Sequence, residues 1–131
     1  MKKLLISGIL LLLIFLVACT KEEANCREDI VGTYEEVTGN PRSILEIREG
    51  QGNKGLTIVW FRKDNAGQTT LMDTLTATLS ENCTIIDIPY QTTTTNHSYE
   101  EGILSVSNGR ILGKIEGFHG FITEDIDAIK R

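Results

Sequence analysis

The chain contains few of the residues on which most catalytic, metal-binding and nucleic-acid-binding sites depend. Its 131 residues include two histidines, three cysteines and one tryptophan, and 13 basic residues against 18 acidic ones. No basic stripe is present, and this charge balance argues against nucleic acid as a partner. His97 and His119 lie apart with no tight ligand spacing around either, so we expect no metal site.

Motifs of the common hydrolases and nucleotide-binding proteins are also missing. The sequence has no Gly-x-Ser-x-Gly, no His-Glu-x-x-His, no phosphate-binding glycine loop and no helix-loop-helix calcium loop. Acidic residues are numerous, so a carboxylate pair for glycoside hydrolysis stays open as an alternative, although solvated strand faces explain the same numbers. We therefore predict that the protein is not an enzyme and needs no cofactor.

The one long apolar run lies at the N-terminus and is too short for a membrane span. It extends from Leu4 to Val17, which is 14 residues, whereas a bilayer core requires roughly 20. Lys2 and Lys3 precede it and small residues end it. A basic start, a short apolar run and a small-residue exit are typical of a secretory signal peptide.

The end of this run carries a more specific pattern. Leu16-Val17-Ala18-Cys19 resembles the lipobox of bacterial lipoproteins, in which the cysteine receives a diacylglycerol and becomes the first residue. The resemblance implies that residues 1–18 are removed and that acylated Cys19 holds the chain at a lipid bilayer. A plain signal peptide with a coincidental cysteine is the alternative.

The residues after Cys19 suggest a destination. Thr20-Lys21-Glu22-Glu23 resembles the export signal that carries Bacteroidota lipoproteins to the outer face of the outer membrane. The resemblance implies an outer-membrane lipoprotein at the cell surface, with the periplasmic face as the alternative. A charged, solvated tether would have the same composition.

The mature chain is long enough for one domain, and it contains one pair of cysteines. We assign residues 19–28 to the lipidated cysteine and tether and residues 29–131 to the domain. Cys26 and Cys83 lie 57 positions apart in an exported chain, which predicts a disulfide; two free thiols are the alternative.

Beyond the tether the sequence predicts β-structure throughout. Short apolar and β-branched runs alternate with Gly, Asn and Asp clusters, and Asn108-Gly109 is the clearest hairpin turn. A short terminal helix is the alternative for the last segment. The eight predicted strands are 30–37, 44–49, 56–62, 70–79, 84–90, 99–106, 110–118 and 121–130.

Alternation along these runs predicts which side chains enter the core. Leu71, Leu75, Ala77 and Leu79 should share one face, and glycines on one face of 110–118 indicate a tight bend or a close backbone approach. Of Trp60 and Phe61, one should be core and the other should point away. The expected inward positions are Ile58, Leu75, Ile86, Ile88, Ile103 and Ile115.

We predict an all-β fold, a small antiparallel barrel or sandwich of about eight strands. Ile30-Val31-Gly32-Thr33-Tyr34 looks like the Gly-x-Trp start of lipocalin-like domains, with tyrosine in place of tryptophan. The segments 86–91, 101–104 and 108–112 are similar to small Bacteroidota lipoproteins. The resemblance implies a fold and a location and no particular reaction.

One loop has a composition suited to binding. The segment after residue 90 is rich in hydroxyl and amide groups and flanked by aromatic rings, so it could contact a glycan or a protein; an ordinary polar connector is the alternative. Its candidate binding residues are Tyr90, Thr92, Thr93, Thr94, Thr95, Asn96, His97 and Tyr99.

Two patterns suggest covalent modification. Asp73-Thr74-Leu75 resembles the site of O-glycosylation in Bacteroidota exported proteins, with Thr74 as the acceptor; a strand with those residues by chance is the alternative. Asn82-Cys83-Thr84 and Asn96-His97-Ser98 match the N-glycosylation pattern, but a lipobox implies a bacterium, so we interpret both asparagines as turn residues.

Together these patterns predict a lipid-anchored exported protein that acts as a non-enzymatic binding or structural module at the cell envelope. Two alternatives stay open. One is a small envelope hydrolase or protease inhibitor, and the other is a lipocalin-like carrier of a small apolar ligand. We expect the barrel interior to be filled with side chains.

Overall fold

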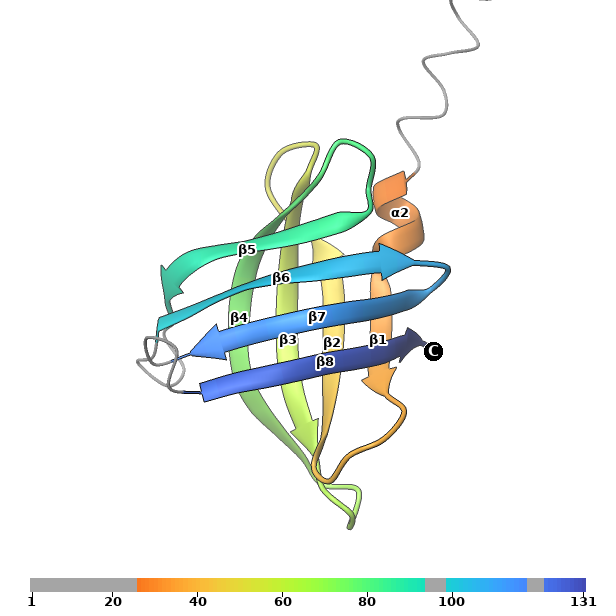
Figure 1. Cartoon of the computed structure of the whole chain (residues 1–131), viewed down its shortest axis with the longest axis vertical. Helices are drawn as coiled ribbons and strands as arrows, with labels where there is room; N and C mark the ends of the chain where they lie inside the picture. The colour runs from red at the N-terminus through yellow and green to blue at the C-terminus, as the bar shows by residue number, and fades with distance from the viewer. Residues whose placement is uncertain (1–25, 94–98, 118–121) are drawn as a thin grey trace, which may run out of the picture.

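The computed structural model describes residues 26–93, 99–117 and 122–131, which form one short helix and eight strands (Figure 1). The helix, α2, spans Cys26–Ile30. The strands are β1 Gly32–Glu36, β2 Arg42–Glu49, β3 Gly55–Lys63, β4 Thr69–Leu79, β5 Ile85–Thr92, β6 Tyr99–Ser107, β7 Arg110–Gly117 and β8 Ile122–Lys130.

The strands form a closed antiparallel barrel, as the sequence predicted. Each strand pairs with the next along the chain, and β8 pairs with β1 to close the barrel. Strands β5 to β8 cross in front of β1 to β4 at a steep angle (Figure 1). The last segment is strand β8, so the helical alternative is wrong.

The turn between β6 and β7 is the one that the sequence marks most clearly. Asn108 and Gly109 have φ values of 49° and 72°, and Ser107 pairs with Arg110 on either side of them. Two central residues with positive φ match the right-handed twist of the strands, which explains the Asn-Gly choice.

Helix α2 closes one end of the barrel, and the predicted start of the first strand is wrong because it falls in this helix. Ile30 was expected to begin that strand, but it ends α2, where its side chain is buried and its carbonyl accepts a 2.8 Å hydrogen bond from the Tyr34 hydroxyl. Cys26, Arg27 and Glu28, which we assigned to the tether, begin the helix.

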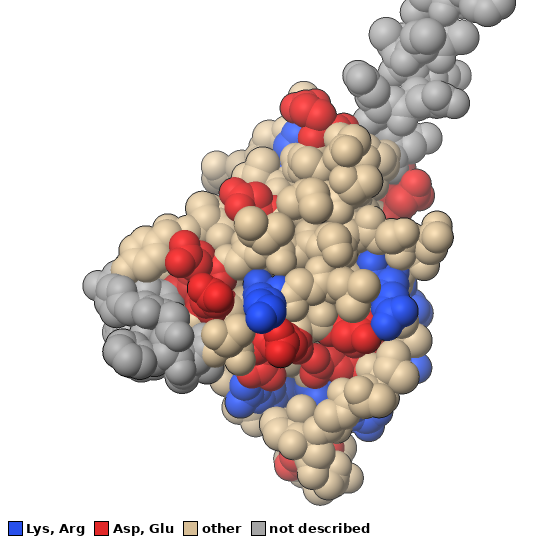
Figure 2. Space-filling view, in the orientation of Figure 1, with Lys and Arg blue, Asp and Glu red and all other residues tan. Residues whose placement is uncertain are grey.

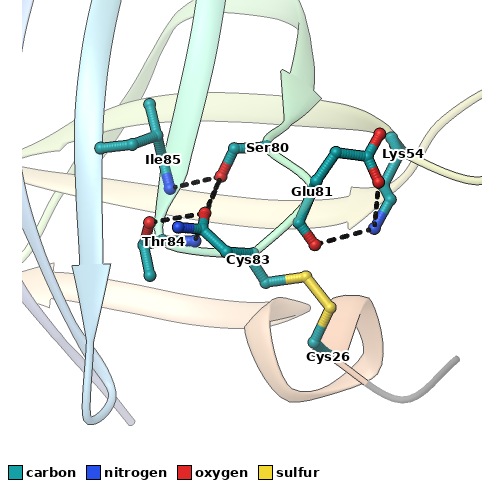
Figure 3. Close-up of a disulfide and its surroundings, with 8 residues drawn as sticks. Cys26, Lys54, Ser80, Glu81, Cys83, Thr84 and Ile85 are labelled. Carbon is teal, nitrogen blue, oxygen red and sulfur yellow. Dashed lines mark hydrogen bonds and ion pairs between the residues drawn. A yellow bond between two sulfur atoms is a disulfide. The ribbon is translucent and has the colours of Figure 1, made fainter. Parts of the chain in front are cut away.

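Four contacts hold α2 against the strands, and the predicted disulfide is one of them. Cys26 in α2 is bonded to Cys83 in the turn between β4 and β5 (Figure 3). Arg27 donates to the Gly52 carbonyl at 2.6 Å and pairs with Glu49 at 3.3 Å, and Lys130 of β8 donates to the Asp29 carbonyl at 2.6 Å. The helix is therefore fixed to three separate parts of the barrel.

The interior is apolar toward α2. Of the six predicted inward side chains, five are buried: Ile58, Leu75, Ile86, Ile88 and Ile115. The prediction for Ile103 is wrong, since its side chain is 62% exposed. Strand β6 directs Gly102 and Leu104 inward, as their register partners Ile115 and Gly113 show, and Ile103 between them points outward.

A second correction concerns the start of β4. Leu71 is 43% exposed, whereas Leu75, Ala77 and Leu79 are buried as predicted. The pairing of β3 with β4 shifts register between Trp60 and Phe61, which leaves Met72 as an extra residue. Such a bulge interrupts the alternation of faces, so Leu71 does not follow the core face that continues beyond it.

Two glycines allow β6 and β7 to approach closely. For Gly113 this is the second of the two predicted possibilities, a close backbone approach and not a tight bend, while Gly102 was not part of the prediction. A Cβ on Gly113 would lie 2.2 Å from the Ile103 carbonyl oxygen, and one on Gly102 would lie 2.4 Å from that of Lys114. Both obstacles are backbone atoms, so any larger residue would force the strands apart. This close approach shapes the outer surface of these two strands.

The barrel is joined less completely between β4 and β5. Their described register contains only Thr78 with Asp87 and Leu79 with Ile86. Beyond it the Gln91 side chain makes the hydrogen bonds that a paired strand would make. Its amide oxygen accepts from the Thr76 backbone nitrogen at 2.9 Å, and its amide nitrogen donates to the Thr76 carbonyl at 2.8 Å. These two bonds hold the end of β5 next to β4.

Candidate functional site

A groove of about 440 Å³ lies on the outer face of β5, β6 and β7. Two of its lining residues are large and exposed: Ile103 is 62% exposed, and Tyr90 is 53% exposed. Large side chains with this much exposed apolar surface often mark contact sites when they are grouped. The groove is lined by Asp87, Ile88, Pro89, Tyr90, Glu101, Gly102, Ile103, Gly113, Lys114 and Glu116.

Charged side chains flank the exposed isoleucine on both neighbouring strands. In register, Ile103 lies opposite Asp87 of β5 on one side and opposite Lys114 of β7 on the other. The Lys114 ammonium is already paired with Asp125 of β8 at 3.6 Å. The positive charge in the groove is therefore partly neutralised, while its carboxylates are not.

Two of those carboxylates lie side by side. Glu101 and Glu116 are register partners on β6 and β7, and within the described ranges neither side chain takes part in an ion pair or a hydrogen bond. Like charges directly opposite each other on adjacent strands destabilise a sheet. Figure 2 shows acidic residues gathered over the left-hand ends of β6 and β7.

The predicted binding loop only partly coincides with this groove. Tyr90 lines the groove, and Thr92 is exposed at the end of β5. Thr93, in contrast, is only 3% exposed, and Tyr99 begins β6. Thr94, Thr95, Asn96 and His97 lie outside the described residues, as does His119.

The predicted modification sites lie elsewhere. Thr74 is exposed on β4, next to Asp73, whose side chain is buried. Asn82 acts as a turn residue: its side-chain oxygen accepts hydrogen bonds from the hydroxyls of Ser80 and Thr84 at 2.8 Å each. Asn96 lies outside the described residues.

At the barrel end opposite α2 the interior is polar, and a series of contacts connects its charged groups. The Ser43 backbone nitrogen donates to Glu36 at 2.6 Å, and the Trp60 indole donates to the Ser43 hydroxyl at 3.1 Å. The Arg62 guanidinium lies 5.9 Å from the centre of the Trp60 ring and pairs with Glu124. We call Glu36, Ser43, Trp60, Arg62 and Glu124 the mouth ring.

One carboxylate beside the mouth ring is not fully satisfied. Asp73, in register with Trp60, is completely buried; one oxygen accepts from the Thr74 backbone nitrogen at 3.1 Å, and the other has no hydrogen-bond partner in the structure. In the mouth ring itself, Glu36 and Glu124 are each bonded. Most charged groups of the mouth ring are therefore bonded to one another, whereas Glu101 and Glu116 in the groove have no partner among the described residues.

Among the residues described, no group of three or more histidine, cysteine, aspartate or glutamate side chains is arranged to hold a metal ion. In the same part of the chain, no helix has the length and apolar character needed to cross a membrane.

The mouth ring predicts a pH effect on stability. Burial raises the pKa of Glu36, and the nearby Glu124 carboxylate raises it further, against hydrogen bonds that lower it. A carboxyl whose pKa is raised on folding stabilises the fold below its ordinary pKa of 4.5, and this contribution is lost as the pH rises through the folded-state pKa. Glu36→Gln, which keeps the acceptor for Ser43, should therefore raise the free energy of unfolding at neutral pH.

The gain from Glu36→Gln should shrink when denaturation is measured below pH 4.5, where the native glutamate is protonated. Glu46→Gln on the exterior of β2 provides the comparison, because Glu46 is paired only with the exposed Arg48. An equal gain from Glu36→Gln at both pH values would show that its charge is not the cause.

Comparison of the chain with protein-family models, with curated proteins and with solved structures gives no match in any of the three.

Proposed function

We propose that the protein is a lipid-anchored, exported binding module of the bacterial cell envelope, and that it captures a partner in the outer groove of β5, β6 and β7. The observation that carries this proposal is the exposed Ile103 in a groove whose carboxylates form no ion pair with any described residue. An aliphatic side chain that is 62% exposed gains stability only when a partner covers it.

The anchor is supported by the sequence pattern. Leu16-Val17-Ala18-Cys19 supplies the lipidation site, and Thr20 to Asn25 form a tether of six residues before α2. A flexible tether of that length reaches on the order of 13 Å. The barrel would therefore be held close to the outer membrane, at the cell surface, through the acyl chains on Cys19 alone.

A binding role fits this architecture better than the alternatives. Buried apolar side chains from all eight strands and from α2 occupy the barrel interior, which favours a packed core over a carrier of apolar ligands. A hydrolase needs two carboxylates that face each other with room for substrate between them. Glu36 and Glu124 already accept a hydrogen bond or an ion pair, and Glu101 and Glu116 are neighbours on one face of the sheet. The groove is open to solvent and lined by side chains available for contact.

Site-specific photo-cross-linking in intact cells tests the groove as the partner site. A photoreactive residue at Ile103 should give a cross-linked product of defined mass. The same residue at Leu112, which is 43% exposed on the same face but outside the groove, should not. Equal products from both positions, or products from Leu112 alone, would show that the groove is not where the partner binds.

A further inference from the structure

We infer that the partner which occupies the groove is a basic peptide segment, one apolar side chain flanked by lysine or arginine, displayed by a protein. This inference rests on the proposed function, since it takes the groove to be the partner site. It is carried by three features of the groove: the position of Ile103, the balance of charge around it, and the pairing of Glu101 with Glu116.

The apolar residues that line the groove suit an apolar side chain. Ile103 is exposed on β6, which approaches β7 closely, and β5 contributes Pro89 and Tyr90 to the lining. An aliphatic side chain beside an aromatic ring packs well against a leucine, isoleucine or phenylalanine. Sugar rings, in contrast, stack best on flat aromatic faces, and among the described lining residues only Tyr90 is aromatic.

The charge around these apolar residues suits a cation on the partner. Asp87, Glu101 and Glu116 line the groove against the single cation of Lys114, which is itself paired with Asp125. A lysine or arginine next to the apolar side chain of the partner would meet at least one unpaired carboxylate. An acidic segment would meet like charge, which excludes it as a partner.

A second copy of this chain does not fit the same surface. A two-fold contact through the groove would place the acidic side chains of one copy against those of the other, because a symmetric interface uses the same patch on both partners. The net charge of the whole chain, −5 at pH 7, adds to that repulsion.

Glu101 and Glu116 lie opposite each other in register, so the inference predicts opposite effects on stability and on binding when one of them is replaced. The two like charges oppose each other across β6 and β7, which weakens the fold when the groove is empty. A bound cation between them would remove the repulsion. Glu116→Gln should therefore raise the melting temperature of the unbound protein and at the same time weaken binding of a basic peptide.

The test uses the mature chain with Cys19→Ala, so that it is soluble, and three synthetic peptides of equal length. The first carries a central leucine flanked by lysine and arginine, the second has the basic residues replaced by glutamate, and the third has serine in place of leucine. We expect the first peptide to bind, and the other two to bind at least about fivefold more weakly.

Matched variants locate the binding. Glu101→Gln/Glu116→Gln should weaken binding of the basic peptide about fivefold or more. The control, Glu49→Gln/Glu81→Gln, removes the same charge from exposed positions outside the groove and should leave binding within about twofold. The melting temperature should rise in the groove variant.

Three results would overturn the inference. The acidic peptide could bind as well as the basic one, a mixture of neutral oligosaccharides such as cellohexaose could bind in preference to all three peptides, or sedimentation could show a dimer that the groove substitutions abolish. In the first two cases a persistent cross-link at Ile103 would leave the groove as a partner site, so only the nature of the partner would be wrong. Loss of both peptide binding and the Ile103 cross-link would contradict the proposed function as well.

Discussion

The variant Cys26→Ala/Cys83→Ala is expected to lose about 4 kcal/mol from its free energy of unfolding. The disulfide closes a loop with a sequence separation of 57 residues, and most of its effect comes from restricting the unfolded chain. Its native role is to fix α2 to the turn between β4 and β5 (Figure 3). Equilibrium denaturation of the soluble domain measures the loss.

Helix α2 depends strongly on this bond. A helix of five residues has no stability of its own, because nucleation costs more than so few hydrogen bonds return. The native chain measured with and without a reductant is the control, and the reduced form should match the double variant. A double variant whose denaturation midpoint equals that of the oxidised protein would contradict the stabilising role of the disulfide.

Cys19→Ala is expected to abolish lipid attachment, because it removes the thiol that would carry the diacylglycerol. Each buried CH₂ of an acyl chain contributes about 0.8 kcal/mol to membrane binding, so two or more long chains retain a small domain almost permanently.

Metabolic labelling with a fatty-acid analogue, followed by fractionation, measures this loss. Thr20→Ala serves as the matched control, because it changes the next residue without removing the thiol and should be labelled like the native chain. Equal labelling of the Cys19→Ala protein would remove the basis for a lipid anchor.

The fold was largely predictable because local signals and the global topology agree. Eight runs separated by turn residues gave eight strands, and Asn108-Gly109 specified the tight turn that joins β6 to β7. A meander in which every strand pairs with its neighbour needs no long-range information about strand order. The errors arose where a distant contact decided the local structure.

Ile30 and Leu71 are two such errors. The β-branched Ile30 has the propensity of a strand residue, but the disulfide of Cys26 and the hydrogen bond from Tyr34 hold it at the end of a helical turn. Leu71 belongs to a strand that alternates correctly from Asp73 onward, and only the partner strand reveals the bulge at Met72.

The candidate site was less predictable than the fold. Tyr90 was identified because it flanks a loop with a composition suited to binding. The groove residues Ile103, Glu101 and Glu116 were not identified as binding residues, and Ile103 was assigned to the core by residue type. The signal that could have corrected this is alternation: Glu101 and Ile103 share a face, and Gly102 and Leu104 share the other. Cross-strand neighbours such as Glu101 and Glu116 cannot be paired from a single sequence without the register.

The most direct test of binding in the groove is an amide chemical-shift map of the Cys19→Ala mature chain titrated with the basic, leucine-centred peptide. Binding in the groove predicts that the largest changes fall in the segments 87–90, 101–103 and 113–116, with the mouth ring and α2 unchanged. Changes centred on Ser43, Trp60 and Asp73 would contradict it, because they would place the binding site inside the barrel and leave the outer groove as an ordinary surface.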